Sequence, residues 1–138
     1  MLPAALDDPD PVIIFEHAAL YNSEGDLPED GAPVDLDRAV VRRPGTDFGL
    51  ITYGGSLPKT LIASAELAQD GISAQLLDLR SLRPLDTEAI LATVAATHRI
   101  VIVDEGWKTA GISAEIAASI AEGAICELDA PIRRVCSV

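Results

Sequence analysis

Residues 48–86 constrain the fold more than any other stretch of this chain. The stretch begins with a short apolar run, turns at Gly54 and Gly55, continues through a helix-forming segment and ends in a second apolar run. A short apolar run is typical of a buried parallel strand, and the return to a parallel neighbour requires a helical crossover of about this length. The stretch therefore predicts one strand-helix-strand unit of a parallel sheet.

Signals at both ends define the helix of this unit. Ser56 is the expected N-cap, and Pro58 falls in the first turn, where its missing N–H is harmless. Gly71 suits the left-handed position just beyond the helix end. The apolar face is predicted to consist of Leu57, Leu61, Ala65 and Ala68.

The rest of the chain after position 38 extends this unit. A short edge strand is predicted at 39–43, a helix capped by Asp86 or Thr87 runs to about Ala96, and a central strand follows at 100–103. Isoleucines recurring every four residues predict a helix over 112–123, and the last strand is predicted at 132–136. The fold class that follows is α/β, with three αβα layers around a mostly parallel sheet of about five strands.

The N-terminal part differs in composition from the rest. All charged side chains before Arg38 are acidic, and residues 22–33 are rich in Gly, Pro and acids, which is typical of a linker. Residues 12–15, a β-branched and aromatic run, predict a strand that belongs to a different domain. We therefore expect two parts, 1–33 and 34–138.

Charge and cysteine usage limit the classes of partner and compartment. The formal net charge of -12 disfavours nucleic acid and anionic lipid surfaces as partners. No run approaches the roughly 20 apolar residues of a membrane span. Cys126 and Cys136 make a poor disulfide framework, and the first residues lack the layout of a signal peptide, so a cytoplasmic protein is expected.

Few residues suggest chemistry. Gly54 and Gly55 fit either a tight structural turn or a phosphate cradle, but no glycine-rich nucleotide motif accompanies them. Asp104 and Glu105 lie at a predicted strand end beside Trp107. The two acids fit general acid-base chemistry or a partner interface. They equally fit solvated surface acids, with Trp107 covering an edge of the core. The two histidines have no companions at metal-ligand spacing.

Five segments in order carry a resemblance to a known family. They are VIIFEHAALY, RAVVRRPGTDFGLITYGGSLPKTL, LLDLRSLRPLD, IVIVDEGW and LDAPIRRV. Together they resemble the beta subunit of the 2-oxo acid dehydrogenase E1 component, of the pyruvate, acetoin or branched-chain type. That family is transketolase-like, with a pyrimidine-binding domain followed by a transketolase C-terminal domain. The resemblance implies that 1–33 is the end of the first domain plus a linker and that 34–138 is the second.

The resemblance also implies a division of labour. In the family, a glutamate of the first domain activates thiamine diphosphate, and the alpha subunit holds the diphosphate and magnesium. No position here matches those roles, so no catalytic, cofactor-binding or metal-binding residue is expected on this chain, and the chain alone is expected to be inactive. The chain also departs from the family at Ala18, where lysine is usual, and it stops at Val138, where the family continues to a terminal helix.

The implied partners are an E1 alpha subunit, a second beta subunit and the basic peripheral subunit-binding domain of E2. Asp129 matches a family position that contacts that domain, although it equally suits a turn before Pro131, and Glu105 and Trp107 are further candidates for partner binding. Two alternatives stay open. The chain could be a stand-alone, non-catalytic interaction module, or the C-terminal domain of a deoxyxylulose-phosphate synthase or transketolase.

Overall fold

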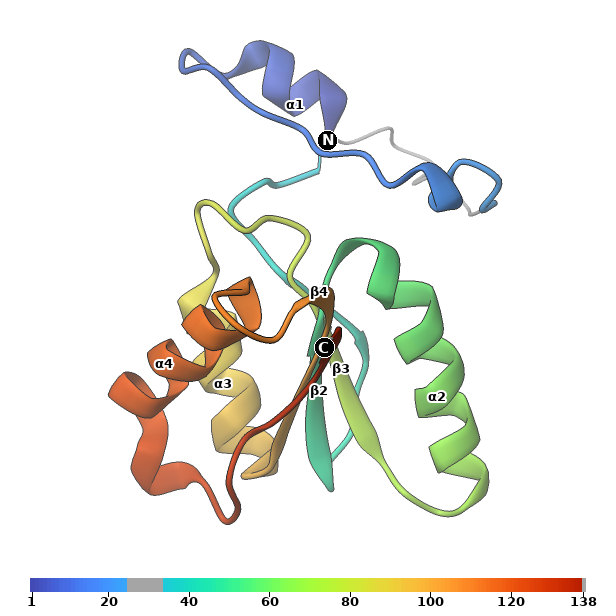
Figure 1. The fold of residues 1–138 in the computed structure, drawn as a ribbon, viewed down its shortest axis with the longest axis vertical. Helices are drawn as coiled ribbons and strands as arrows, with labels where there is room; N and C mark the ends of the chain where they lie inside the picture. Colours follow the sequence, from blue (N-terminus) through green and yellow to red (C-terminus); the bar gives the residue numbers. More distant parts are fainter. Residues whose placement is uncertain (25–33, 138) are drawn as a thin grey trace.

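A five-stranded sheet forms the centre of the computed structural model, which describes residues 1–24 and 34–137 (Figure 1). The strands are β1 (Val40–Arg43), β2 (Phe48–Thr52), β3 (Ala74–Asp78), β4 (Ile100–Trp107) and β5 (Arg133–Ser137). The α-helices are α1 (Leu2–Asp7), α2 (Leu57–Gln69), α3 (Thr87–Thr97) and α4 (Ile112–Ala124), with 3-10 turns η1 (Ala18–Leu20), η2 (Gly54–Ser56) and η3 (Ile125–Glu127). The predicted linker lies outside the described residues from position 25 onward.

The sheet has the order β1-β3-β2-β4-β5. Edge strand β1 pairs antiparallel with β3, whereas the other three pairings are parallel. Helices α3 and α4 lie on one side of the sheet and α2 on the other (Figure 1). The predicted α/β fold, with three layers and a mostly parallel five-stranded sheet, is confirmed.

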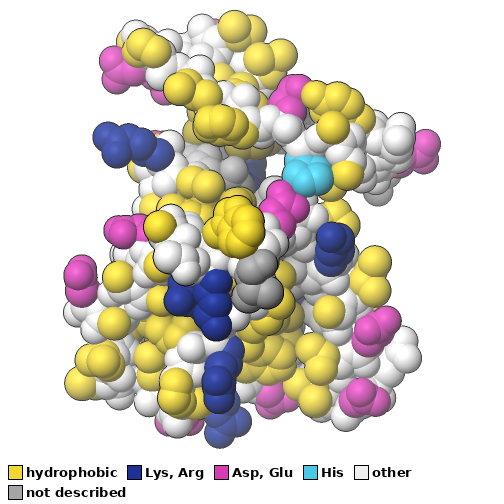
Figure 2. Space-filling view, viewed as in Figure 1, with side chains coloured by type: hydrophobic (Ala, Val, Ile, Leu, Met, Phe, Trp, Pro, Cys, Tyr) yellow, Lys and Arg dark blue, Asp and Glu magenta, His cyan; other side chains and the backbone are white. Residues whose placement is uncertain are grey.

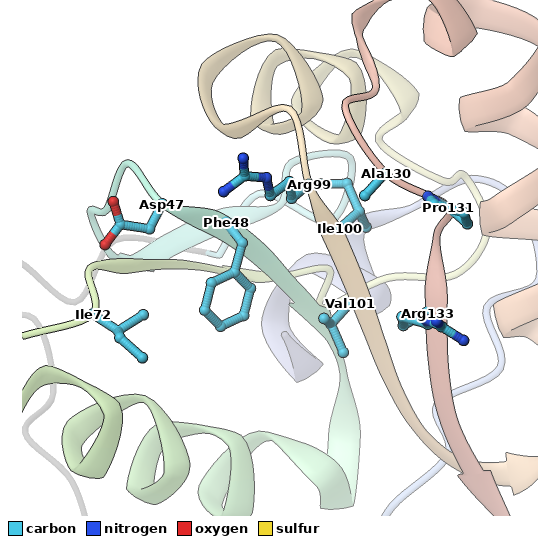
Figure 3. Close-up of a pocket in the computed structure, with 9 residues that line it drawn as sticks. All are labelled: Asp47, Phe48, Ile72, Arg99, Ile100, Val101, Ala130, Pro131 and Arg133. Atoms are coloured by element: carbon cyan, nitrogen blue, oxygen red, sulfur yellow. The ribbon is translucent and has the colours of Figure 1, made fainter. Parts of the chain in front are cut away.

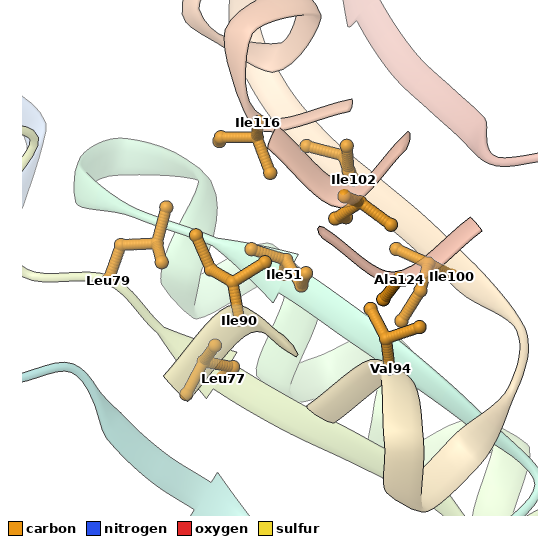
Figure 4. Close-up of a cluster of buried hydrophobic side chains, with 10 residues drawn as sticks. Ile51, Leu77, Leu79, Ile90, Val94, Ile100, Ile102, Ile116 and Ala124 are labelled. Atoms are coloured by element: carbon orange, nitrogen blue, oxygen red, sulfur yellow. The ribbon is translucent and has the colours of Figure 1, made fainter. Parts of the chain in front are cut away.

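Most of the hydrophobic core lies between the sheet and helices α3 and α4 (Figure 4). Its buried members are Ile51, Leu77, Leu79, Ile90, Val94, Ile100, Ile102, Ile116, Ile120 and Ala124. The strand period of two sends alternate residues to the opposite side, where Leu50, Ala74 and Leu76 form a smaller cluster under α2. Most of the buried hydrophobic side chains therefore lie on one face of the sheet, the face covered by α3 and α4.

Helix α2 buries a different face from the one predicted. Thr60 and Ser64 are buried against the sheet, whereas Leu61 is 38% exposed. The two hydroxyls donate to backbone carbonyls, Thr60 Oγ1 to Ser56 O at 2.8 Å and Ser64 Oγ to Leu61 O at 3.1 Å, so their burial leaves no unmet hydrogen bond. Of the predicted face, Leu57 does pack against the cluster under α2, but Leu61, Ala65 and Ala68 are exposed. That part of the prediction is wrong, because hydrophobicity alone does not recognise satisfied small polar residues as core.

The helix termini follow the sequence signals in part. Asp86 caps α3 by accepting a hydrogen bond from Ala89 N at 3.0 Å, and Gly71 adopts a φ of 79°, as predicted. Ser56 immediately precedes α2 but makes no capping hydrogen bond with its side chain. The turn η2 enters α2 directly, so the first turn of the helix does not depend on a cap at Ser56.

The N-terminal segment, residues 1–24, lies beyond the carboxyl end of the sheet (Figure 1). The strand predicted at 12–15 is not formed, and Ile13 and Phe15 are 77% and 92% exposed. The prediction failed because β propensity needs a partner strand, and none pairs with this run in the described residues. In the described part of the chain, no helix has the length and apolar character needed to cross a bilayer.

Candidate functional site

The carboxyl ends of β2 and β4 bring the predicted chemical residues together. The two strands are parallel neighbours, so Tyr53 after β2 and Asp104 in β4 meet at one edge of the sheet. The turn of Gly54 and Gly55 leaves the same edge, and Glu105 follows Asp104 there. In α/β folds this edge is the usual place for a functional site.

Asp104 is the centre of a buried hydrogen-bond network at this edge. The residue is 3% exposed, and its Oδ1 accepts from Tyr53 OH at 2.6 Å and from Gly106 N at 2.7 Å. Its Oδ2 accepts from Ser113 N, in the first turn of α4, at 3.3 Å. The carboxylate therefore ties the end of β2, the end of β4 and the start of α4 together.

The two members of the short hydrogen bond have opposite pKa shifts. Burial acts to raise the pKa of Asp104, but the hydrogen bonds from Tyr53, Gly106 and Ser113 outweigh it and hold the pKa below its usual value. Burial, followed by the hydrogen bond to Asp104, raises the pKa of Tyr53. Asp104 is thus ionised at neutral pH, and Tyr53 keeps its proton and donates it to the carboxylate in a hydrogen bond.

Glu105 faces the N-terminal segment and pairs with His17. Their Nε2 and Oε1 atoms are 3.2 Å apart, with the two side chains 38% and 44% exposed. The His17 ring lies over Gly55, where an added Cβ would come within 2.5 Å of the ring. His17 Nδ1 is buried and has no hydrogen-bond partner in the described residues. Gly55 is therefore required for close approach of the N-terminal segment.

A carboxylate lies directly beside the glycine turn. A Cβ on Gly55 would lie 2.7 Å from Glu105 Oε2, so a carboxylate occupies the space next to the glycine turn. That charge repels a phosphate at the start of α2. The described residues also contain no cluster of three or more His, Cys, Asp or Glu side chains that could hold a metal ion. The turn of Gly54 and Gly55 thus lies between the His17 ring and the Glu105 carboxylate.

Trp107 ends β4 and is 69% exposed. The backbone on both sides of Trp107 is joined to β5, because Ser137 Oγ donates to Glu105 O at 2.8 Å and Lys108 N donates to Ser137 O at 2.9 Å. An indole this exposed does not cover a core edge, so that interpretation is excluded. An exposed tryptophan is typical of residues that anchor a partner.

Asp129 lies at the opposite end of the sheet from Glu105 and Trp107. It follows η3, and its backbone N donates to His98 O, just before β4 begins, at 2.8 Å. Its Oδ2 lies 3.9 Å from Arg99 Nη2, and both side chains are 61% exposed. The structure therefore brings Glu105 and Trp107 together but separates Asp129 from them, and the partner-binding role of all three stays a prediction.

Two residues of this edge were missed by sequence reasoning. Tyr53 had a detectable signal, since a tyrosine directly after a buried strand needs a partner for its hydroxyl. His17 was considered only as a metal ligand, and its contact with Glu105 joins positions too far apart in the chain for any local pattern to reveal.

Comparisons with known proteins agree on one family. The family model of the transketolase C-terminal domain matches residues 37–138. The chain is 44% identical over 136 residues, 98% of its length, to the pyruvate dehydrogenase E1 component subunit beta of Bacillus subtilis, and covers 42% of that protein. It is 44% identical over 137 residues to the corresponding subunit of Porphyra purpurea, covering 41% of it. The chain therefore spans about two fifths of the length of these relatives.

A solved structure supports the fold assignment. The structure titled "Split gene transketolase, inactive beta4 tetramer" aligns with 81% of this chain and 36% of its own chain, with a TM-score of 0.70. The sequence identity is 23%, so the likeness establishes the fold and nothing further.

Proposed function

This chain belongs to the transketolase C-terminal domain family, and from that membership we propose that it is the C-terminal part of the beta subunit of a thiamine diphosphate-dependent 2-oxo acid dehydrogenase. The observation that carries the proposal is the 44% identity, over 98% of the chain, to a pyruvate dehydrogenase E1 beta subunit. In this proposal the chain works in the cytoplasm and contributes subunit assembly and partner docking.

The chain alone is proposed to have no catalytic activity and to bind neither thiamine diphosphate nor magnesium. The support is local: His17 and the Glu105 carboxylate occupy the space next to Gly55. In the full enzyme, the cofactor and its magnesium would be held by the E1 alpha subunit and by the first domain of the beta subunit. Isothermal titration of thiamine diphosphate and magnesium into the chain is expected to give no signal, and a micromolar Kd would contradict the proposal.

Docking of the E2 peripheral subunit-binding domain is the second part of the proposal. The net charge of -12 suits a basic partner, because complementary charge speeds encounter and fixes orientation. We assign Asp129 to the contact with the E2 domain, and Glu105 and Trp107, at the other end of the sheet, to a separate contact with a partner subunit.

Asp129 offers a direct test of docking, because it lies at the opposite end of the sheet from Glu105 and Trp107 and can be changed without touching them. Fluorescence anisotropy of a labelled E2 subunit-binding domain is expected to show binding to the chain. The affinity should fall in 1 M salt, where the Debye length is about 3 Å, and in Asp129→Asn. Binding that ignores both salt and Asp129→Asn would count against docking through acidic residues.

Assembly separates the enzyme subunit from a stand-alone interaction module. Co-expression of the chain with an E1 alpha subunit and a separate pyrimidine-binding domain is expected to yield a complex that decarboxylates a 2-oxo acid. Failure to assemble with either, while the chain remains folded and binds the E2 domain, would favour the module.

A further inference from the structure

Helix α2 carries apolar side chains on its outer side. Thr60 and Ser64 are buried against the sheet, so at about 100° per residue Ile62 points almost directly away from the sheet. Ile62 is 62% exposed, and the neighbouring Leu61 is 38% exposed. A helix that covers a sheet ordinarily turns its polar side chains to water. The polarity of α2 is therefore the reverse of the usual one, and its outer side is a candidate interaction surface.

The apolar strip follows the length of the helix. Pro58, Ala65 and Gln69 lie within about 60° of Ile62 around the helix axis. Exposed apolar side chains with charged ones beside them are visible over α2, on the right of Figure 2. Beyond the helix end, Ile72 lines a cavity at the amino end of the sheet (Figure 3) and does not continue the strip. The strip thus belongs to α2 alone.

Two opposite charges flank the strip on one side. Lys59 and Glu66 are the charged residues of α2, and both are exposed. They are two turns apart on the same flank of Ile62, a separation of about 10 Å along the axis, which is too long for an ion pair within the helix. Neither forms an ion pair elsewhere in the described residues. Leu61 lies on the opposite flank.

This arrangement is complementary to itself. Consider two α2 helices that lie antiparallel, related by a two-fold axis that passes beside Ile62. Lys59 of each copy then lies at the height of Glu66 of the other copy and on the same flank, while the two Ile62 side chains pack together. A segment of any other sequence would not require opposite charges placed symmetrically about Ile62. The symmetry therefore points to a second copy of this chain as the occupant.

We propose that α2 is a self-association site, at which two copies pair antiparallel through Ile62 with reciprocal ion pairs of Lys59 and Glu66. The apolar strip supplies the burial, and the ion pairs fix the direction, because exposed pairs add little affinity. One helix of 13 residues offers less than the roughly 800 Å² per partner of a standard interface, so we expect a weak dimer with a Kd on the order of 0.1 mM. None of the residues assigned to partner binding lies on α2, so the inference does not rest on the proposed function.

Sedimentation equilibrium of the chain, at concentrations up to about 1 mM, measures the association. Lys59→Glu and Glu66→Lys each place like charges opposite one another at both ends of the pair, and each should weaken the dimer about tenfold. Both changes suit the helix dipole, since they put an acid in the first half of α2 and a base in the second half. A weaker dimer therefore reports the contact and not a damaged helix.

Mixing the two single variants tests the reciprocal pairing directly. The acidic side chains of Lys59→Glu face the basic side chains of Glu66→Lys in a mixed pair, so an equimolar mixture should form a dimer that neither variant forms alone at the same concentration. The double variant Lys59→Glu with Glu66→Lys should associate as the unmodified chain does. A chain that is monomeric at about 1 mM, a dimer that the single variants do not weaken, or a mixture that stays monomeric would each overturn the proposal.

A matched pair of isoleucines tests the apolar strip. Ile62→Ser should weaken the dimer about tenfold or more, because both copies lose their central contact. Ile125→Ser is the control, since Ile125 lies in η3 and is 61% exposed, close to the 62% of Ile62, and it should leave the dimer unchanged. Circular dichroism checks that both variants keep the fold. Equal weakening by the two variants would mean that association is not located at α2 and would overturn the proposal.

Discussion

The two faces of the sheet differ in how completely they are covered. On the α3 and α4 side, Ile51, Ile102 and Ile116 are fully buried. On the α2 side, Leu76 is fully buried, but Val101 and Val103 are only partly buried and Val135 is exposed. The closed face buries more apolar surface, so it supplies more of the hydrophobic stabilisation.

The difference teaches that one face supplies most of the burial within this small domain. The closed face gives a chain of this size the packing it needs to stay folded, whereas Val103 and Val135 on the other face stay partly or largely exposed. Residues 102 and 103 are neighbours in β4, yet one belongs to each face. Substitutions along this strand can therefore compare the two faces directly.

The largest expected effect comes from opening a cavity on the closed face. Ile102→Ala removes buried atoms from a site with 0% exposure and should lower the free energy of unfolding by about 4 kcal/mol. Val103→Ala, one residue on, should lower it by about 1 kcal/mol, because the open face already leaves that side chain partly hydrated. Urea denaturation of the two variants measures both values. Losses of equal size would mean that the two faces are equally packed.

The closed face should also resist an added methyl group. A Cβ on Gly49 would lie 2.7 Å from Thr93 Cγ2 and 2.8 Å from Ile100 Cδ1. Gly49→Ala therefore overpacks the contact between β2 and α3 and should cost about 2 kcal/mol. Thermal unfolding followed by circular dichroism gives the shift. An unchanged midpoint would show that α3 can move away from the sheet freely.

Much of this closed face could be predicted from the sequence. Isoleucines 112, 116 and 120 recur at helical spacing, and 100–103 is a continuous β-branched run, so hydrophobic pattern and burial agree. The α2 side could not be predicted in the same way. Thr60 and Ser64 are buried there through hydrogen bonds to the backbone of their own helix, a compensation that a hydrophobicity pattern does not register.

The candidate site shows the same limit. The sequence placed Asp104, Glu105 and Trp107 at a strand end, and β4 carries them there. The sequence did not show that Asp104 is buried while Glu105 is exposed. The burial of Asp104 depends on Tyr53 and Ser113, which approach it from other elements. Nor did the sequence predict the contact of His17 with Glu105, since the run before His17 indicated a strand that is not formed.

The ionised carboxylate of Asp104 lies at the carboxyl end of the sheet. Removing its charge should have an intermediate effect on the free energy of unfolding. Asp104→Asn weakens the bonds from Tyr53 OH, Gly106 N and Ser113 N and should cost about 2 kcal/mol at pH 7. The folded-state pKa lies below the ordinary value of about 4, so the folded chain binds fewer protons than the unfolded chain in acid. The stabilisation is therefore present above about pH 4 and is lost as the pH falls through the folded-state pKa.

Denaturation of both proteins between neutral and acidic pH measures this contribution. The difference in unfolding free energy between the unmodified chain and Asp104→Asn should be constant near neutrality and shrink in acid. Tyr53→Phe provides the control, because it removes one donor and keeps the charge. A difference that persists undiminished in acid would mean that Asp104 stabilises the fold without being ionised.

The smallest effect on stability is expected on the open face. Val135 is 57% exposed on edge strand β5, so Val135→Asp places its carboxylate largely in water and should change the free energy of unfolding of the chain by no more than about 0.5 kcal/mol. The same change at a position such as Ile102 would bury an unpaired charge and unfold the domain. Urea denaturation of Val135→Asp beside Val41→Asp, on the other edge strand, makes the comparison at matched exposure. A loss above about 2 kcal/mol at Val135 alone, a value typical of core positions, would mean that this side chain contributes to packing as a core residue does. A near-neutral result would mean that the open face contributes little to the stability of the described fold.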